Sequence, residues 1–231
     1  AALILGPRIR AHSHKDIPHN IPFVVLGASL LWFGWFGFNA GSALAANELA
    51  INAAITTMLG ASSAVTSWTL LAWLRDSRPS AVGASAAAVI GLVAITPACG
   101  FVTPMGAIAI GSITAIITQM ILLHLSNFKK IDDTADVFAC HGVAGAIGSL
   151  LTGVFATTSV NPAGKDGLLY GNYSLLWNQT IAVVVAISVS VVLTSAILLF
   201  LRKIVNIRTS PKEEVQGIDL VEHGEQAYDH S

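Results

Sequence analysis

The sequence predicts an all-α fold class, a polytopic membrane helix bundle with six transmembrane helices. Composition is the first observation behind this prediction. Hydrophobic residues make up 54% of the chain and charged residues 11%, whereas soluble domains carry roughly 25% charge. The second observation is that Asp, Glu, Lys and Arg are absent from five long stretches, residues 17–47, 49–74, 79–128, 137–164 and 167–201.

The charge-free stretches set the number of helices. A transmembrane helix needs about 20 apolar residues, so each stretch has room for one helix and the stretch at 79–128 has room for two. Within that stretch, "TPACGFVTP" at 96–104 contains two prolines and a glycine, which predicts a break between two helices. The predicted spans lie near residues 20–41, 49–73, 80–97, 105–126, 136–156 and 174–202.

The basic residues predict the orientation. An even number of spans puts both ends of the chain on one side, and of the basic residues only Lys165 falls on the other side. Basic residues concentrate on the cytoplasmic side of membrane proteins. We therefore expect the end of a preceding helix and a cytoplasmic loop at 1–16, the membrane bundle at 17–203 and a cytoplasmic tail at 204–231. The basic residues on the cytoplasmic side are Arg8, Arg10, Lys15, Arg75, Arg78, Lys129, Lys130, Arg202, Lys203, Arg208 and Lys212.

Charge and cysteine content exclude several classes of protein. A net charge of −1 gives no sign of a nucleic-acid partner. Cys99 and Cys140 do not form a metal-binding pattern, and we interpret both as small apolar packing residues. We therefore expect no metal and no cofactor. Small residues recur instead at helix-packing intervals, at Gly83, Ala87 and Gly91 and in "GVAGAIG" at 142–148, which predicts close contacts between membrane helices.

A single histidine lies inside the fifth apolar segment, "DVFACHGVAGAIGSLLTGVFA" at 136–156. His141 follows Asp136 by five residues, which places it about 7.5 Å along the helix. Ionisable residues inside membranes are costly and commonly functional. An uncharged imidazole has one donor and one acceptor, which suits it to passing a small molecule or a proton. The alternative is a structural histidine bonded to a backbone carbonyl.

Three acidic residues precede the histidine. Acids at a helix N-terminus are stabilised by the helix dipole and by capping, so we interpret Asp132 and Asp133 as N-terminal acids of the fifth span. Asp136 lies about one turn deeper. For Asp136, a structural role and a role in a pore remain equal alternatives.

A second group of candidates lies at the outer end of the first span, in "LWFGWFGFNAGSA" at 31–43. Trp35, Phe38 and Ser42 are spaced so that they share one face of a helix. A tryptophan there is commonly an interfacial belt residue. Two aromatic rings and a hydroxyl on one face also suit a small cation, through cation–π attraction and a hydrogen bond. Thr96, at the end of the third span, caps the broken helix or lines a pathway.

Four segments together resemble the ammonium transporter family, which includes ammonium, methylammonium and Rhesus-type proteins. They are "GWFGFNAGSA", "TPACGFV", "DDTADVFACHGVAGAIGSLLTGVFA" and "GIDLVEHGEQAY", and the resemblance covers essentially the whole chain. It implies a homotrimer in the plasma membrane, with eleven helices per subunit built from two inverted five-helix repeats and a last long helix. This chain resembles helices six to eleven, and "AALILGPR" resembles the end of helix five.

The resemblance also implies roles for individual residues. His141 matches the second of the family's twin pore histidines, Phe38 a residue that gates the pore from outside, and Ser42 a hydroxyl that recruits ammonium. Trp35 matches a tryptophan beside the pore, and Asp136 an acid near its inner end. Thr96 lies in a motif near the pore.

The function implied is ammonium or ammonia transport through a hydrophobic pore with a histidine pair. This chain supplies one histidine, and the N-terminal half of the same transporter would supply the other. Partners implied are the substrate, membrane lipid, and a cytoplasmic regulatory protein at the tail. The alternatives are a channel for another small neutral molecule and an ammonium sensor, although the residues after Lys203 are too few for a signalling domain. An enzyme is not expected, because the spans hold no candidate catalytic dyad.

Overall fold

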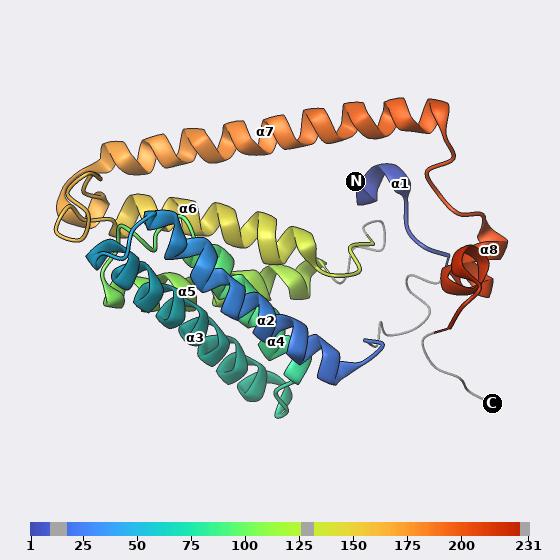
Figure 1. The fold of residues 1–231 in the computed structure, drawn as a ribbon, viewed down its shortest axis with the longest axis horizontal. Helices are drawn as coiled ribbons and strands as arrows, with labels where there is room; N and C mark the ends of the chain where they lie inside the picture. Colours follow the sequence, from blue (N-terminus) through green and yellow to red (C-terminus); the bar gives the residue numbers. More distant parts are fainter. Residues whose placement is uncertain (10–17, 126–131, 227–231) are drawn as a thin grey trace. The chain divides into compact units, whose positions relative to one another are not determined.

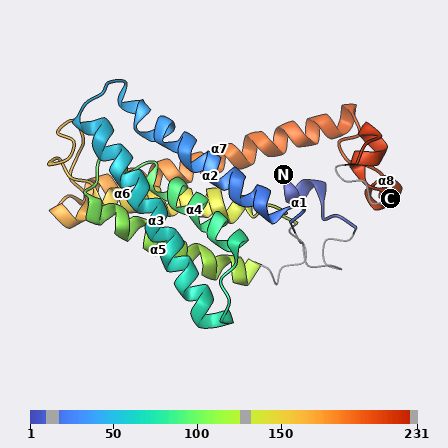
Figure 2. The same ribbon diagram turned by 60° about the horizontal axis from the view of Figure 1, so that its bottom comes forward.

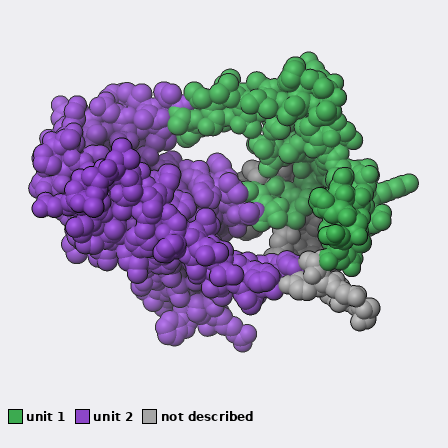
Figure 3. All heavy atoms as spheres, in the orientation of Figure 1, with its two compact units in different colours: residues 1–17, 128–134, 186–231 green, residues 18–127, 135–185 purple. Residues whose placement is uncertain are grey.

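The computed structural model describes residues 1–9, 18–125 and 132–226 of the chain. These residues belong to two compact units (Figure 3). The larger unit comprises Pro18–Asn127 and Ala135–Val185, and the smaller unit comprises Ala1–Ile17, Phe128–Thr134 and Ala186–Ser231. All six candidate site residues lie in the larger unit.

The larger unit is a bundle of helices (Figures 1 and 2). Helix α3 is central to it, because α3 packs extensively against both α4 and α5. Helix α6 is continuous with a preceding π-helical turn, η2, and both contact α4 and α5. The elements are α2 (Ile21–Asn39), η1 (Gly41–Ala43), α3 (Glu48–Asp76), α4 (Ala81–Ile95), α5 (Pro104–Leu125), η2 (Phe138–Val143), α6 (Ala144–Phe155), η3 (Leu168–Tyr170) and the first part of α7 (Tyr173–Ile204).

Polar residues fix where three of these helices begin. The side chain of Asn20 accepts a hydrogen bond from the N–H of the third residue of α2, at 3.0 Å. Asn47 does the same at the start of α3, and Ser80 at the start of α4, each at 3.0 Å. Such caps satisfy backbone N–H groups that have no partner within the helix.

The predicted membrane spans are confirmed as helices, whose ends differ from the predicted bounds by a few residues. Five helical segments of the described chain are long and apolar enough to cross a membrane, whereas α4 has 15 residues. Helix α4 is shorter than the predicted 80–97 because it ends at Ile95 and the chain turns before α5 starts at Pro104. The predicted break is therefore confirmed. Asn52 and Thr56 donate hydrogen bonds to the carbonyl of Cys99 in this turn, at 2.9 and 2.8 Å.

The small residues allow the helices to approach closely, as their spacing predicts. A Cβ added at Gly91 would lie 2.6 Å from the Cβ of Ala64 on α3, and one added at Gly148 would overlap the backbone of Ala94. Gly142 differs from this expectation, since among the described residues a Cβ there would meet only the ring of Phe138, one turn earlier. In the segment at 142–148, the close approach to α4 is therefore made at Gly148, whereas Gly142 is not in contact with another helix of the described chain.

The smaller unit contains α1 (Ala2–Leu5), the end of α7 (Tyr173–Ile204), α8 (Pro211–Gln216) and a π-helical turn, η4 (Asp219–His223). Helix α7 buries none of its residues against the rest of the described chain. Its 32 residues carry charge only in the last turn, at Arg202 and Lys203. A long apolar helix with exposed sides is what a lipid environment favours.

Ion pairs organise the smaller unit. Arg208 donates to the carbonyls of Leu5 and Pro7, each at 2.7 Å, and to a carboxylate oxygen of Glu214 at 2.8 Å. Arg8 donates to both carboxylate oxygens of Asp132, at 2.7 and 2.8 Å. The interpretation of Asp132 as an acid of the fifth span's N-terminus is therefore wrong. The helical segment starts at residue 138 and has no acidic residue in its first turn. The Asp132 carboxylate instead forms a bidentate ion pair with the guanidinium of Arg8.

Candidate functional site

The end of α2 carries an aromatic pair. The ring centroids of Trp35 and Phe38 lie 6.0 Å apart, and the ring planes make an angle of 70°. This is the edge-to-face arrangement that aromatic rings prefer. Trp35 is half-buried, whereas the Phe38 side chain is 62% exposed. Phe38 is therefore held at one edge by Trp35 while most of its surface faces away from the described bundle.

Trp35 is oriented by a hydrogen bond to a different helix. Its indole Nε1–H donates to the hydroxyl oxygen of Thr96 across 2.7 Å. The Thr96 hydroxyl in turn donates to the carbonyl of Leu92, also at 2.7 Å. Thr96 lies at the C-cap of α4, so its hydroxyl adds a second donor to a carbonyl of α4, which also accepts the N–H of Thr96, and accepts the indole N–H of α2. Of the two alternatives considered for Thr96, the structure places it at the cap of the broken helix, and the role of lining a pathway stays a prediction.

Ser42 lies on a separate turn. The sequence predicts Trp35, Phe38 and Ser42 on one helical face, but α2 ends at Asn39 and Ser42 belongs to the 3₁₀ turn η1. The turn still connects the hydroxyl to the end of α2, because Ser42 Oγ donates to the backbone carbonyl of Phe38 at 2.6 Å. That donation uses the only proton of the hydroxyl, so the remaining capacity of Oγ is to accept hydrogen bonds.

Asn39 is a positioning residue that the sequence analysis did not single out. It is 6% exposed, and its Nδ2 donates to Thr57 Oγ1 on α3 at 2.9 Å. Thr57 Oγ1 donates in turn to the carbonyl of Ala53 at 2.6 Å. This chain of bonds holds the end of α2 against α3. The signal in the sequence was an amide at the end of an apolar span, where an unpaired polar group is costly.

His141 lies on the π-helical turn η2. The N–H of Ala144 donates to the carbonyl of Ala139, which is the i to i−5 bond of a π-helix. Single π-helical turns occur frequently at functional sites. Cys140 and Ala144 are buried against Ile90, while the His141 side chain is exposed. The imidazole therefore points out of the described bundle and is not enclosed between its helices.

Asp136 marks the start of this segment. Its φ of 51° places it in the left-handed region, which Asp tolerates better than most residues. Its carbonyl accepts the first hydrogen bond of the segment, from the N–H of Cys140 at 2.8 Å. Its side chain is exposed. Because Asp136 is in the left-handed conformation, the helical segment cannot extend further toward the N-terminus. The acids that precede Asp136 therefore lie outside the helix.

Four of the six candidate residues are connected to one another by hydrogen bonds or ring contacts, and the other two, Asp136 and His141, lie on a different segment. Trp35, Phe38, Ser42 and Thr96 form one connected cluster, which we call the outer cluster. Among the described residues, His141 makes no hydrogen bond or ion pair to this cluster. The described part of the chain also contains no group of three or more His, Cys, Asp or Glu side chains suited to a metal ion.

These features define a class of protein. Apolar helices packed through small residues, with a polar cluster at a helix end and a histidine on an apolar span, are typical of polytopic α-helical membrane transporters and channels. The model of the Ammonium Transporter Family matches residues 1–228 of the chain. The chain belongs to this family.

Relatives and solved structures agree with this assignment. The chain is 41% identical over 230 residues to an ammonium transporter of Bacillus subtilis (strain 168), covering 100% of this chain and 56% of that protein. It is 47% identical over 230 residues to an ammonium transporter of Aquifex aeolicus (strain VF5), covering 98% of this chain and 52% of that protein. The chain therefore spans about half the length of these relatives. Both are named as transporters, which agrees with the expectation that the chain is not an enzyme.

Two solved structures share its fold. The crystal structure of Saccharomyces cerevisiae Mep2 matches with a TM-score of 0.84 at 35% identity, covering 92% of this chain and 50% of that one. A structure described as "Sensor Amt Protein" matches with a TM-score of 0.84 at 36% identity, covering 96% of this chain and 55% of that one. The polytopic membrane helix bundle that the sequence predicts is confirmed.

Proposed function

We propose that the complete protein transports ammonium or ammonia across the membrane through an apolar pore with a pair of histidines, of which this chain supplies His141. The observation that carries the proposal is the position of His141. It lies on a membrane-spanning segment, on a π-helical turn, with its imidazole directed out of its own bundle. An imidazole facing lipid would be costly, so a protein-lined passage is the favourable surrounding for it.

The outer cluster is suited to receiving ammonium. Ammonium is a hydrogen-bond donor without a lone pair, so it needs an acceptor. Ser42 Oγ offers its lone pairs, since its proton is directed to the carbonyl of Phe38. The indole of Trp35 is held by Thr96, and the Phe38 ring is exposed. Aromatic faces near a cation add attraction of about 0.5–2 kcal/mol.

The chemistry of the pore follows from the cost of charge in an apolar medium. A full ammonium charge in a narrow apolar passage is expensive. Separating the proton from ammonia, or sharing the charge with histidines, avoids that cost. An uncharged His141 accepts a hydrogen bond at one ring nitrogen and donates one at the other. In this proposal ammonia passes along the imidazoles, and a proton travels by the same rings.

The remaining parts of the proposal concern the whole assembly. The passage past His141 is completed by the N-terminal half of the same transporter, and three copies associate in the plasma membrane. Both ends of this chain lie on the cytoplasmic side, which the distribution of basic residues supports. The tail from residue 204 onward is the contact site for a cytoplasmic regulatory protein. Asp136 lies at the inner end of the passage.

The test is the change His141→Ala in the complete protein. We expect methylammonium uptake to fall at least tenfold or its selectivity over potassium to be lost. His124→Ala is the matched control, because His124 is also a histidine near the end of a membrane helix, and uptake should stay close to that of the unchanged protein. Full uptake with unchanged selectivity in His141→Ala would refute the role given to His141.

Measurements of ammonium flux distinguish transport from two other functions. A channel for another small neutral molecule would conduct water or carbon dioxide at a rate that ammonium does not affect. A sensor, the function stated in the description of one structural neighbour, would bind ammonium without net flux. Ammonium-dependent current or uptake in proteoliposomes supports transport over both.

A further inference from the structure

A short loop, residues 157–166, follows α6, and we call it the outer loop. Its ends are joined by a hydrogen bond from the N–H of Gly167 to the carbonyl of Ala156, at 2.8 Å. Inside this closure, Asp166 Oδ1 accepts the backbone N–H of Thr158 at 2.7 Å and its hydroxyl at 3.1 Å. Loops whose ends meet in this way are compact, and they are frequently functional. The Asp166 side chain therefore ties the end of the outer loop to its start.

The Asp166 carboxylate is held by hydrogen bonds within the loop. The bond from the N–H of Thr158 is the main cause that holds the pKa of this carboxyl below its usual value of 3.8, ahead of desolvation, which raises it, and of the hydroxyls of Thr158 and Thr157, which lower it. Among the described residues, no basic side chain forms an ion pair with it. Hydrogen bonds to an ionised group are roughly twice as strong as those between neutral groups. The charged carboxylate is therefore a stronger tie than a neutral side chain would be.

The outer loop holds Phe101, which lies in the turn between α4 and α5. The N–H of Thr157 donates to the carbonyl of Phe101 at 2.8 Å. A Cβ added at Gly164 would lie 2.9 Å from the Phe101 ring, so the ring lies directly against the backbone of the loop. Thr157 and Gly164 belong to opposite limbs of the loop, so their relative position, which both contacts require, depends on the Asp166 tie. Helix α3 holds the same turn through the carbonyl of Cys99.

The turn connects Phe101 to the outer cluster. The N–H of Phe101 donates to the carbonyl of Ala98 at 2.8 Å, and the N–H of Ala98 donates to the carbonyl of Ile95 at 2.9 Å. Thr96 lies within this hydrogen-bonded turn, and its hydroxyl accepts the indole N–H of Trp35. A displacement of Phe101 therefore reaches the acceptor that orients the aromatic pair.

We propose that Asp166 is a positioning residue for the recruitment of ammonium. It closes the outer loop, the loop holds Phe101, and the turn that contains Phe101 carries Thr96. The inference rests on the function proposed above and adds a residue that acts on the outer cluster from outside it. Asp166 belongs to a different segment from His141, so its loss weakens recruitment and leaves the rate of passage through the pore unchanged.

A carboxylate also attracts a cation by its charge, so the experiment has to separate charge from position. Asp166→Asn keeps an acceptor oxygen for the N–H of Thr158 and removes the charge, whereas Asp166→Ala removes both. If position decides, Asp166→Asn behaves as the unchanged protein does. Lys165→Ala is the matched control, because Lys165 is the exposed neighbour of Asp166 and its loss also changes the charge of the loop.

The first measurement is methylammonium uptake by the complete protein in proteoliposomes, as a function of concentration. We expect Asp166→Ala to raise KM about 3- to 10-fold while the maximal rate stays within about twofold of that of the unchanged protein. Asp166→Asn should return KM to within about twofold, and Lys165→Ala should not raise it. Gly164→Ala displaces the Phe101 ring without removing the carboxylate and should raise KM as well. It also serves if Asp166→Ala does not fold.

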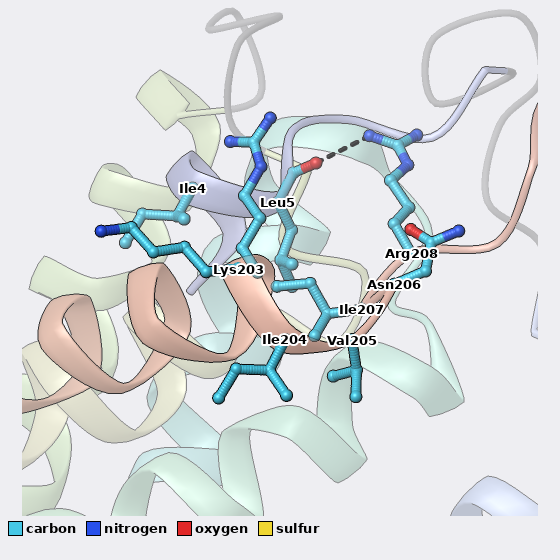
Figure 4. A pocket seen from close by; sticks show the side chains of 9 residues that line it. Ile4, Leu5, Lys203, Ile204, Val205, Asn206, Ile207 and Arg208 are labelled. Atoms are coloured by element: carbon cyan, nitrogen blue, oxygen red, sulfur yellow. Dashed lines mark hydrogen bonds between the residues drawn. The ribbon is translucent and has the colours of Figure 1, made fainter.

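The second measurement is hydrogen exchange at residues 95–102, which reports on the turn whether or not the protein transports. Asp166→Ala should lower the protection of this turn, and Asp166→Asn should keep it. Residues 202–208 of the smaller unit are the internal reference. They line a cavity of about 410 Å³, beside which Arg208 donates to the carbonyl of Leu5 (Figure 4), and their exchange should not change.

The possible results bear on separate points. Unchanged KM or unchanged protection of the turn in Asp166→Ala would overturn the positioning role. So would a KM in Asp166→Asn as high as in Asp166→Ala, which would assign the effect to charge, or a fall in maximal rate at unchanged KM. If no form of the protein takes up methylammonium, the proposed function fails, and the exchange measurement still supports or overturns the tie between Asp166 and the turn.

Discussion

The indole N–H of Trp35 on α2 donates to the hydroxyl of Thr96 at the end of α4, across 2.7 Å. This bond joins two residues that are 61 positions apart in the chain. It holds the aromatic pair of the outer cluster in one orientation, and it depends on an acceptor that Val, the closest apolar substitute for Thr, does not have.

Thr96→Val is therefore expected to destabilise the protein by about 1–3 kcal/mol, because the indole N–H loses its partner in an apolar environment. Thr96→Ser keeps the hydroxyl and should cost less. The measurements are the Tm in detergent and the concentration of ammonium at half-maximal uptake, which should rise several-fold in Thr96→Val. If the double variant Trp35→Phe and Thr96→Val shows the sum of the two single effects, the two side chains are not coupled and the bond has no role.

Two other buried threonines, Thr118 and Thr57, are expected to respond in opposite ways when each is changed to valine. The hydroxyl of Thr118 on α5 is fully buried and has no hydrogen-bond partner among the described residues. Thr118→Val removes an unpaired polar group, so we expect an unchanged or higher Tm. The hydroxyl of Thr57 is equally buried but bonds to Asn39 and Ala53. Thr57→Val should cost about 1–3 kcal/mol.

The comparison between these two variants is the control, since both exchange a buried hydroxyl for a methyl group of similar size. A marked loss of stability in Thr118→Val would mean that a bound water or another part of the protein satisfies its hydroxyl. That outcome would contradict the assignment of an unpaired group.

The close approach of α6 to α4 depends on Gly148. Because a Cβ there would overlap the backbone of Ala94, Gly148→Ala must separate the two helices, and overpacking of this kind costs about 1–3 kcal/mol. Gly27→Ala on α2 is the matched control, because no neighbouring atom of the described residues lies within 4 Å of its added Cβ. Thermal unfolding in detergent should show a lower Tm for Gly148→Ala only. Equal Tm values would show that the helices pack differently.

The contact between the tail and the N-terminal segment should depend on pH. The N–H of Ile9 donates to Glu214 at 3.1 Å. This bond, and then the bond from Arg208, hold the pKa of the Glu214 carboxyl below its usual value of 4.5, while desolvation and, to a smaller extent, nearby Asp132 raise it. A lowered pKa stabilises the contact above pH 4.5. That stability is lost as the pH falls through the lowered pKa.

Hydrogen exchange in residues 1–9 and 204–218, corrected for the intrinsic rate at each pH, measures this contact. Protection should decrease below about pH 4.5, and Glu214→Gln should already have low protection at pH 7. Glu222→Gln changes an acid of η4 and should behave as the unchanged protein does. A pH dependence that survives in Glu214→Gln would assign the effect to another group.

The sequence predicted the features that depend on local composition. Charge-free stretches located the apolar helices, and the prolines at 97 and 104 located the break that ends α4 at Ile95. The motifs around Trp35 and His141 identified the family and the candidate site. These predictions are possible because burying a charge in a membrane is costly at any position of a helix. The absence of charged residues from a segment can therefore be read directly from the sequence.

Tertiary structure decided the features that depend on partners distant in the chain. The sequence placed Asp132 on a helix, whereas the structure pairs it with Arg8, 124 positions away. It placed Ser42 on the helix of Phe38, whereas α2 ends earlier and the hydroxyl reaches back from a turn. By itself the sequence determined which segments enter the membrane, because hydropathy is a property of each segment. Which side chains meet, and that the imidazole of His141 faces out of its bundle, was decided only when the helices packed.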